Sequence, residues 1–449
     1  MTGTRTVAFH GDRSGRCGLT WGQKWIWRAV HSQAPELRHL NMSRTVAVPE
    51  GRDLETVLAG LATITARHEG LRTRFSVDET GTPCQTFARA GELPVQIVDA
   101  AGEDPEAVAG QTLARLESLP FTVAELSLRA AVVTYGGVPS YVVLTAFHMA
   151  VDHRGLAMVA EDLAAELDGS APGTFTHPLD RVAHEHSAEG RRASADSLRF
   201  WERELSRFPA DMLPAPPAPP AEPRFQEVAL RSRALHTAVR ALAARYHVAD
   251  AAVVLAFVAV LLAHRHGHRS CGFLLFSHNR FHEAARASAT VVQNAPLCLD
   301  VQDRPLRRLL ADAHRRSAVA ALAGQYDPDD LKAPPPDGPD LSCALNLNFP
   351  GHRPEPTDRD IERVDALRAE TRTIDRGGID HDDMRFYLTA FHDSHHTELT
   401  LRADTSVLPA PEIHTFLRSL ETAVITALHR APDEVPEVPG RTSPESAYS

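Results

Sequence analysis

Hydrophobic residues along the chain follow two periodicities. Intervals of three and four residues are typical of amphipathic helices, whereas short apolar or alternating runs bounded by turn residues are typical of strands. Helices are predicted over residues 19–30, 54–68, 105–116, 156–167, 193–205, 233–246, 250–265, 306–323 and 410–429. Strands are predicted over residues 71–77, 94–98, 126–135, 141–147, 271–277, 291–299, 343–349, 385–391 and 397–403. Both element types recur in both halves of the chain, which indicates a mixed α/β class.

The pair Gly136-Gly137 separates two apolar strands and predicts a tight hairpin between them. The second of these strands ends at Phe147 and is followed directly by His148, with Asp152 four residues later. A histidine at a strand end lies at the edge of a sheet, and its near-neutral pKa suits proton transfer. The spacing alone is common by chance, so a structural histidine is the competing interpretation.

A proline-rich segment, residues 209–223, separates the two mixed halves. Such a segment fits neither a helix nor a central strand, and it predicts an extended connector. We therefore expect a two-lobed protein with a cleft between the lobes. The expected parts are an N-terminal lobe over 1–180 that carries His148 and Asp152, a linker region over 181–224, a C-terminal lobe over 225–432 and a disordered tail over 433–449.

Composition limits the classes of partner. The 449 residues are 43% hydrophobic, enough for two sizeable cores, and the formal net charge is −11. That charge argues against broad binding to nucleic acid or to anionic membranes. The N-terminal residues are polar, and the longest apolar run, 251–263, is too short to cross a bilayer. We expect a cytoplasmic monomer without a membrane or nucleic-acid partner.

Neither the cysteines nor the clustered histidines predict a metal site. The five cysteines are scattered and form no Cys-x-x-Cys pair, so we expect reduced, mostly buried thiols. His392, His395 and His396 fall at a polar turn between two predicted strands. We expect solvent-exposed side chains at that turn rather than metal ligands.

Several short segments carry a more specific signal. Residues 67–75 read Arg-His-Glu-Gly-Leu-Arg-Thr-Arg-Phe, and residues 147–153 read Phe-His-Met-Ala-Val-Asp-His. Supporting segments occur at residues 19–27, 199–205, 277–280, 291–297 and 347–351. In this order they resemble the motifs of condensation domains of nonribosomal peptide synthetases, which are chloramphenicol-acetyltransferase-like acyltransferases. The match at 67–75 to the motif Arg-His-Glu-x-Leu-Arg-Thr-x-Phe is the most specific one.

The resemblance implies a chloramphenicol-acetyltransferase-like pseudo-dimer with a V-shaped cleft and a central tunnel. It also implies acyl transfer with no permanently bound cofactor and no metal. The substrate would arrive as a thioester on the phosphopantetheine of a carrier protein.

His148 aligns with the second histidine of the family's His-His-x-x-x-Asp-Gly motif, the one implicated in chemistry. The resemblance assigns it one of two roles, as a general base or as a hydrogen-bonding group that positions the nucleophile. Asp152 would order the loop that presents His148 and would pair with Arg280, so both are expected to be structural.

Two positions depart from the motif, since Phe147 replaces its first histidine and His153 replaces its glycine. Both are expected at the substrate tunnel, where His153 could narrow the passage. Gly155 is expected to line the same tunnel. Asn348 either lines the acyl pocket or closes a strand end.

The resulting hypothesis is a free-standing condensation enzyme that forms an amide or ester bond. The donor would be an acyl thioester on a separate carrier protein, and the acceptor an amine, an alcohol or a second carrier-bound group. Two alternatives remain: a catalytically silent relative that recruits another enzyme, and an acyltransferase that uses coenzyme A thioesters. Carrier proteins are usually acidic, so docking would use arginine pairs. The candidate pairs are Arg191-Arg192, Arg307-Arg308 and Arg315-Arg316.

Overall fold

The computed structural model describes residues 3–32, 41–170, 173–214, 219–281, 286–332, 338–349 and 355–436. It divides into two compact units that are interleaved in sequence. The first comprises Met1–Ala195, His278–Gln293 and Gln325–Leu331, and the second Asp196–Ser277, Asn294–Gly324 and Lys332–Ser449. This division differs from the contiguous lobes expected from the sequence, because two segments of the C-terminal half belong to the first unit. Of the predicted tail, residues 437–449 lie outside the described residues.

The first unit contains a five-stranded sheet and a small three-stranded sheet. The order in the larger sheet is β1 (Gly3–His10), β6 (Ala90–Asp99), β7 (Leu128–Tyr135), β8 (Val138–Phe147) and β3 (Asn41–Ala47). Only β6 and β7 pair in parallel. The smaller sheet has the order β2 (Gly15–Gly18), β5 (Pro83–Phe87) and β4 (Thr73–Val77).

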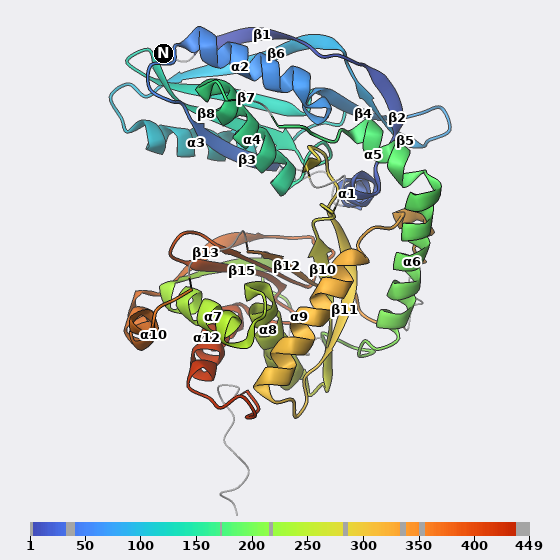
Figure 1. Ribbon diagram of the computed structural model, residues 1–449, viewed down its shortest axis with the longest axis vertical. Helices are drawn as coiled ribbons and strands as arrows, with labels where there is room; N and C mark the ends of the chain where they lie inside the picture. Colours follow the sequence, from blue (N-terminus) through green and yellow to red (C-terminus); the bar gives the residue numbers. More distant parts are fainter. Residues whose placement is uncertain are drawn as a thin grey trace, which may run out of the picture. The chain divides into compact units, whose positions relative to one another are not determined.

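Helices cover both faces of the larger sheet (Figure 1). Successive side chains of a strand point to opposite faces. Accordingly, Ala130 and Val132 of β7 join the core under α2 (Leu54–Arg67) and α4 (His153–Asp168). Ala131 and Val133 join the core under α3 (Pro105–Glu117) instead. The remaining helices of this part of the chain are α1 (Trp21–Ser32), η2 (Glu69–Arg72), α5 (Pro178–Glu185), α6 (Ala188–Leu205) and η4 (Pro328–Asp330).

The second unit is built on a seven-stranded sheet. Its order is β11 (Gln293–Asp300), β10 (Ser270–Ser277), β12 (Cys343–Asn348), β14 (Phe386–His392), β15 (Thr397–Asp404), β9 (Phe225–Ser232) and β13 (Arg372–Ile379). The principal helices are α7 (Arg233–Tyr246), α8 (Asp250–His266), α9 (Leu306–Leu322) and α12 (Ala410–Leu428), and the short ones are α10 (Asp358–Glu362), α11 (Val364–Leu367) and η5 (Arg368–Glu370). All residues of α8 from Ala252 to Ala263 are buried, as expected of a helix that is apolar all round.

Among the described residues, no single helix is long and apolar enough to cross a membrane. The helices α7 and α8 meet the length and composition criteria only when taken together, and they are bent by 105° relative to each other.

The predicted mixed α/β class is confirmed, and the strongly periodic helices and strands lie within a few residues of their predicted bounds. The hairpin is also present, with φ of 59° at Gly136 and 84° at Gly137, values that glycine adopts easily. The predictions missed the helix α5 and several strands whose hydrophobic patterns are short or interrupted, namely β1, β2, β3, β5, β9 and β13. The cleft and the central tunnel stay predictions.

Candidate active site

His148 is presented by the turn that ends β8. The backbone N–H groups of Ala150 and Val151 both donate to the Phe147 carbonyl oxygen, which closes the turn. The Thr290 hydroxyl donates to the carbonyl oxygen of His148 itself. The residue as a whole is partly exposed, although its Nδ1 atom is buried.

The electrostatics around His148 favour a neutral ring. Burial lowers its pKa below the ordinary value of 6.5, and the charge of Asp152 opposes this shift only in part. Its Nδ1 atom is buried and has no hydrogen-bond partner among the described residues. A neutral imidazole can accept a proton at pH 7, which a general base must do.

Asp152 and Arg280 form a bidentate ion pair beside this turn. Arg280 Nη2 lies 2.6 Å from Asp152 Oδ1, and Nη1 lies 2.9 Å from Oδ2. Only 4% of the Asp152 side chain and 8% of the Arg280 side chain are exposed. Arg280 also donates to the carbonyl oxygens of His278, Ala287 and Ala289. The predicted contact is therefore present, and it ties the segment 278–293 to the start of α4.

Asp152 is also the N-cap of α4. Its Oδ1 accepts from the Gly155 N–H at 2.8 Å, and its Oδ2 accepts from the N–H groups of Val291 and Val292. Burial by itself would raise the pKa of Asp152, but the charge and hydrogen bonds of Arg280 and these backbone donors hold it below 3.8. The carboxylate therefore stays ionised near neutral pH and organises two chain segments at once.

Gly155 lies directly against this ion pair. It is buried, and a Cβ atom there would lie 3.2 Å from Arg280 Nη2 and 3.3 Å from Asp152 Oδ1. The small size of Gly155 makes room for the guanidinium and carboxylate groups, and its place at the tunnel stays a prediction.

The ring of Phe147 packs in an aromatic cluster. It stacks on Phe121 at 5.6 Å and meets Phe75 edge-on at 6.1 Å between ring centroids, and only 1% of the residue is exposed. The ring is thus buried in an aromatic cluster, and its place at the substrate tunnel stays a prediction. A phenyl ring stabilises the end of β8 by hydrophobic burial at this position.

His153 is the first residue of α4 and is exposed. Arg44 of β3 lies next to it, with its Nη2 atom 2.6 Å from His153 Nε2. Although the residue is exposed, neighbouring groups partly desolvate its ring, and this desolvation and the positive charge of Arg44 lower the pKa of His153 to about 4. The residue that replaces the motif's glycine is thus neutral near pH 7.

The sequence did not single out three residues that the structure places here, namely Arg44, His278 and Thr290. His278 precedes Arg280 by two positions, and burial lowers its pKa below 6.5. The nearby Arg280, which the sequence did identify, could have indicated His278, whereas nothing in the sequence indicates Arg44. Asn348 ends β12 in the second unit, and its role in the acyl pocket stays a prediction.

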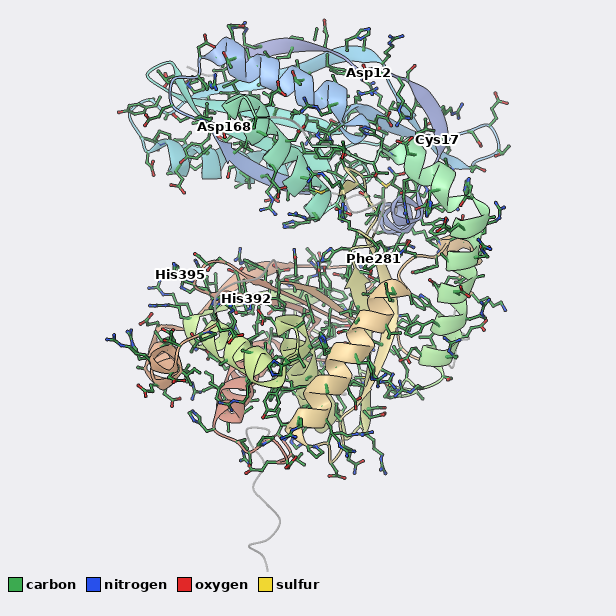
Figure 2. The ribbon with its side chains drawn as sticks, viewed as in Figure 1. Asp12, Cys17, Asp168, Phe281, His392 and His395 are labelled. Atoms are coloured by element: carbon green, nitrogen blue, oxygen red, sulfur yellow. The ribbon has the colours of Figure 1, made fainter. Side chains whose placement is uncertain are left out.

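The histidines after β14 differ from the expectation. His395 is exposed, but His392 is only 5% exposed (Figure 2). The hydroxyl of Thr397 lies 2.6 Å from His392 Nδ1, and the Asp250 carboxylate lies 3.3 Å from its Nε2. The prediction of a solvent-exposed His392 is therefore wrong, because the side chain lies on the inward-facing side of the strand. In the part of the chain that the structure describes, no group of three His, Cys, Asp or Glu residues could hold a metal ion.

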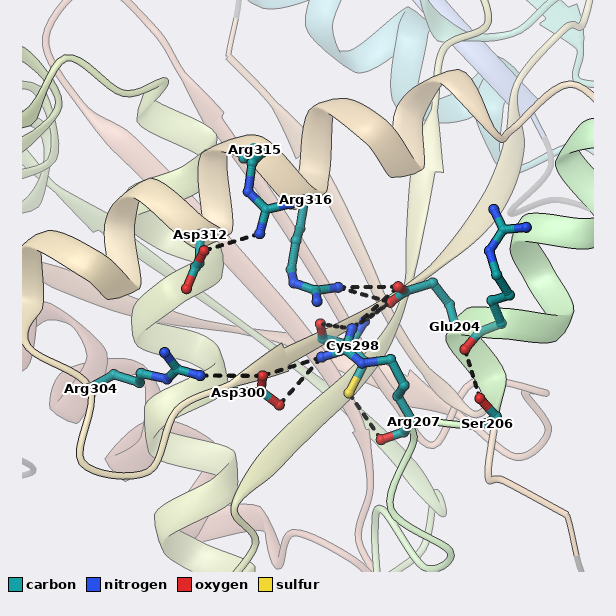
Figure 3. A network of polar contacts seen from close by, with 10 residues as sticks. Glu204, Ser206, Arg207, Cys298, Asp300, Arg304, Asp312, Arg315 and Arg316 are labelled. Carbon is teal, nitrogen blue, oxygen red and sulfur yellow. Dashed lines mark hydrogen bonds and ion pairs between the residues drawn. The ribbon is translucent and has the colours of Figure 1, made fainter.

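One of the three arginine pairs considered for docking is engaged in internal ion pairs (Figure 3). Arg316 and Arg207 both contact the carboxylate of Glu204, at 3.1 Å. Arg315 lies 3.1 Å from Asp312 on the same helix. Glu204 also accepts from the backbone N–H of Cys298. Arg316 therefore holds α6 against α9, and it is a poor candidate for a docking residue.

A protein-family model for the condensation domain matches residues 15–437. Among known proteins, the chain is 28% identical over 264 residues to the isonitrile lipopeptide synthase of Mycobacterium tuberculosis, covering 55% of this chain and 10% of the synthase. It is 29% identical over 275 residues to the AMB antimetabolite synthetase AmbB of Pseudomonas aeruginosa, covering 57% of this chain and 21% of AmbB. The chain thus spans only a small part of these larger proteins.

Solved structures show the same fold. The chain is similar to the structure described as the molecular basis for condensation domain-mediated chain release from the enacyloxin polyketide synthase. That match has a TM-score of 0.75, 19% identity, and coverage of 95% of this chain and 85% of the other. The first condensation domain of the calcium-dependent antibiotic synthetase matches with a TM-score of 0.66, 18% identity, and coverage of 94% and 98%. At these identities the likeness shows the fold. Because the family model spans nearly the whole sequence, the chain belongs to the condensation-domain family of acyltransferases in nonribosomal peptide and other natural-product synthesis.

Proposed function

We propose that this protein transfers an acyl group from a phosphopantetheine thioester on a carrier protein to an amine or hydroxyl acceptor. Condensation domains work on such carrier-bound substrates without a permanently bound cofactor. The observation that carries the proposal is His148, a partly exposed, neutral imidazole presented at the end of β8. A silent recruitment domain would not need a base at this position.

In the proposed reaction, the acceptor nitrogen or oxygen attacks the thioester carbonyl while His148 takes its proton. A new C–N or C–O bond forms, and the C–S bond then breaks. The leaving pantetheine thiolate takes the proton back from His148, so the ring returns to its neutral form. General-base catalysis of this kind contributes about 10²- to 10⁴-fold.

Asp152 and Arg280 act in this scheme as positioning residues. Their ion pair fixes the N-terminus of α4, which follows closely after His148 in the chain. Thr290 comes from a distant part of the chain and donates a hydrogen bond to the carbonyl oxygen of His148. A base held in this way loses little freedom when the acceptor binds, which lowers the entropic cost of the reaction.

The proposal includes a carrier protein on a separate chain, supplied in trans, and action in the cytoplasm, where acyl-loaded carrier proteins are made. The protein would act as a monomer. The acceptor would be a free small molecule or a second carrier-bound group.

The test is a transfer assay with acyl-loaded carrier protein and a panel of amines and alcohols, analysed by mass spectrometry. A parallel series replaces the carrier with the corresponding coenzyme A thioester. His148→Ala should reduce product formation by about 10²- to 10⁴-fold. His10→Ala is the matched control, because His10 is an exposed histidine on β1. Equal amounts of product from wild type and His148→Ala would reject the role of His148 as general base. Product formed only from the coenzyme A thioesters would reject a carrier protein as the acyl donor.

A further inference from the structure

Arg44 occupies an unusual position on the edge strand β3. Its neighbours at alternate positions, Met42 and Val46, pack in the core under α2 and α4. Because alternate residues share a face, the Arg44 side chain lies on the same helix-covered face as these two apolar residues. It is half-buried there, and its guanidinium meets His153 at the first turn of α4.

The short contact fixes the tautomer of His153. A guanidinium has only donors, so His153 Nε2 must accept the hydrogen bond from Arg44 Nη2, 2.6 Å away. A neutral imidazole carries one proton, which is then on Nδ1. His153 therefore acts on Arg44 as a hydrogen-bond acceptor that orients the guanidinium, whose other N–H groups stay donors, while the Nδ1–H of His153 points away from Arg44.

The charge of Arg44 lacks a negative partner. Among the residues that the structure describes, no carboxylate lies within ion-pair distance of its guanidinium. Nearby Arg154 pairs with Glu161 at 3.1 Å, so this carboxylate already compensates another cation. Burial and the charge of Arg154 both lower the pKa of Arg44, and the charge of Glu161 opposes this shift only in part. The Nε atom of Arg44 is buried without a hydrogen-bond partner among the described residues. A half-buried cation beside a second cation is unfavourable unless an anion joins it.

We propose that Arg44, oriented by its hydrogen bond to His153, binds an oxyanion, a carboxylate or a phosphate, carried by a substrate of His148. This inference rests on the proposed function, which supplies the substrate. Two sources fit the chemistry: the phosphate of the phosphopantetheine arm, and a carboxylate on the acceptor. The site lies near the reacting group, because His148 and His278 are both close enough to influence the charge of His153. His153 thus supplies the acceptor that orients Arg44, which the motif's glycine could not do.

Isothermal titration calorimetry with matched probe pairs tests the site directly. Phosphopantetheine is compared with pantetheine, and benzoate with benzamide, on wild type and on Arg44→Gln. Arg74→Gln is the matched control, because Arg74 is an exposed arginine of the same unit. A charge-assisted hydrogen bond predicts that one anionic probe binds wild type about tenfold or more tightly than its neutral counterpart. This preference should disappear in Arg44→Gln and persist in Arg74→Gln.

The probe pair that shows the preference identifies the source of the oxyanion. Absence of a preference in wild type, or a preference that survives Arg44→Gln, would overturn the proposal. Should Arg44→Gln fail to fold, His153→Gly is the substitute, because His153 is exposed, and unchanged anion affinity in that variant would equally overturn it. Transfer activity that depends on His148 but occurs without any anion preference would reject only this site and leave the proposed function intact.

Discussion

Replacing Arg280 by alanine should destabilise the first unit strongly. The substitution removes the bidentate partner of Asp152 but leaves a carboxylate that is only 4% exposed. Three backbone donors remain on that carboxylate, from Gly155, Val291 and Val292, and they cannot neutralise its charge. The variant therefore keeps a buried, uncompensated anion at the start of α4.

The magnitude follows from the burial of both partners. Breaking a buried ion pair by removing one member costs roughly 3–5 kcal/mol. In a cooperative unit of roughly 200 residues, each kcal/mol lowers Tm by about 2–4 °C, so Tm should fall by about 6–20 °C. Asp152→Ala should lower the stability by a comparable amount, because it leaves the charge of Arg280 buried without its ion-pair partner and also removes the N-cap of α4.

Thermal melts of Arg280→Ala, Asp152→Ala and the double variant, followed by circular dichroism at pH 7, measure this effect. The loss of stability in the double variant should be much smaller than the sum of the losses in the two single variants, because the second substitution removes a charge that is already unpaired. Arg5→Ala is the control, since its pair with Glu55 is exposed at 49% and 69% and should cost less than about 1 kcal/mol. Wild-type melting of both single variants would refute the reasoning. The pair's contribution should be present above pH 3.8 and be lost as pH falls through the lowered pKa of Asp152.

Two further predictions concern His148. Since burial lowers the pKa of His148, the acid limb of the kcat/KM profile against pH should lie below pH 6.5. The charge of Asp152 opposes this lowering, so Asp152→Asn should move the acid limb to a still lower pH. An acid limb at or above pH 6.5 in the wild type would contradict the reasoning. Thr290→Val removes the hydroxyl that holds the His148 carbonyl, so kcat should fall about tenfold with KM little changed, while Thr290→Ser retains activity. A lowered Tm with unchanged kcat would mean that Thr290 is only structural.

Much of the architecture could be predicted because its signals are local. The helices α7, α8, α9 and α12 carry apolar residues at helical spacing, and the β7–β8 hairpin has two glycines that accept positive φ. By contrast, β1 and β13 expose most of their side chains, so their stability comes from pairing with β6 and β9 rather than from a pattern of their own. Strand pairing between distant segments leaves little trace in a local pattern.

The sequence by itself determined the family, the mixed α/β class and the place of His148 at a strand end, because motifs and hydrophobic periodicity are properties of neighbouring residues. Only the tertiary structure decided that Phe147 is sealed among other aromatic rings, that Gly155 makes room for an ion pair, and that Arg44 meets His153. These contacts join residues far apart in the chain, or depend on which face of an element is covered. Burial and charge compensation at such points arise from packing in three dimensions, which residue order does not specify locally.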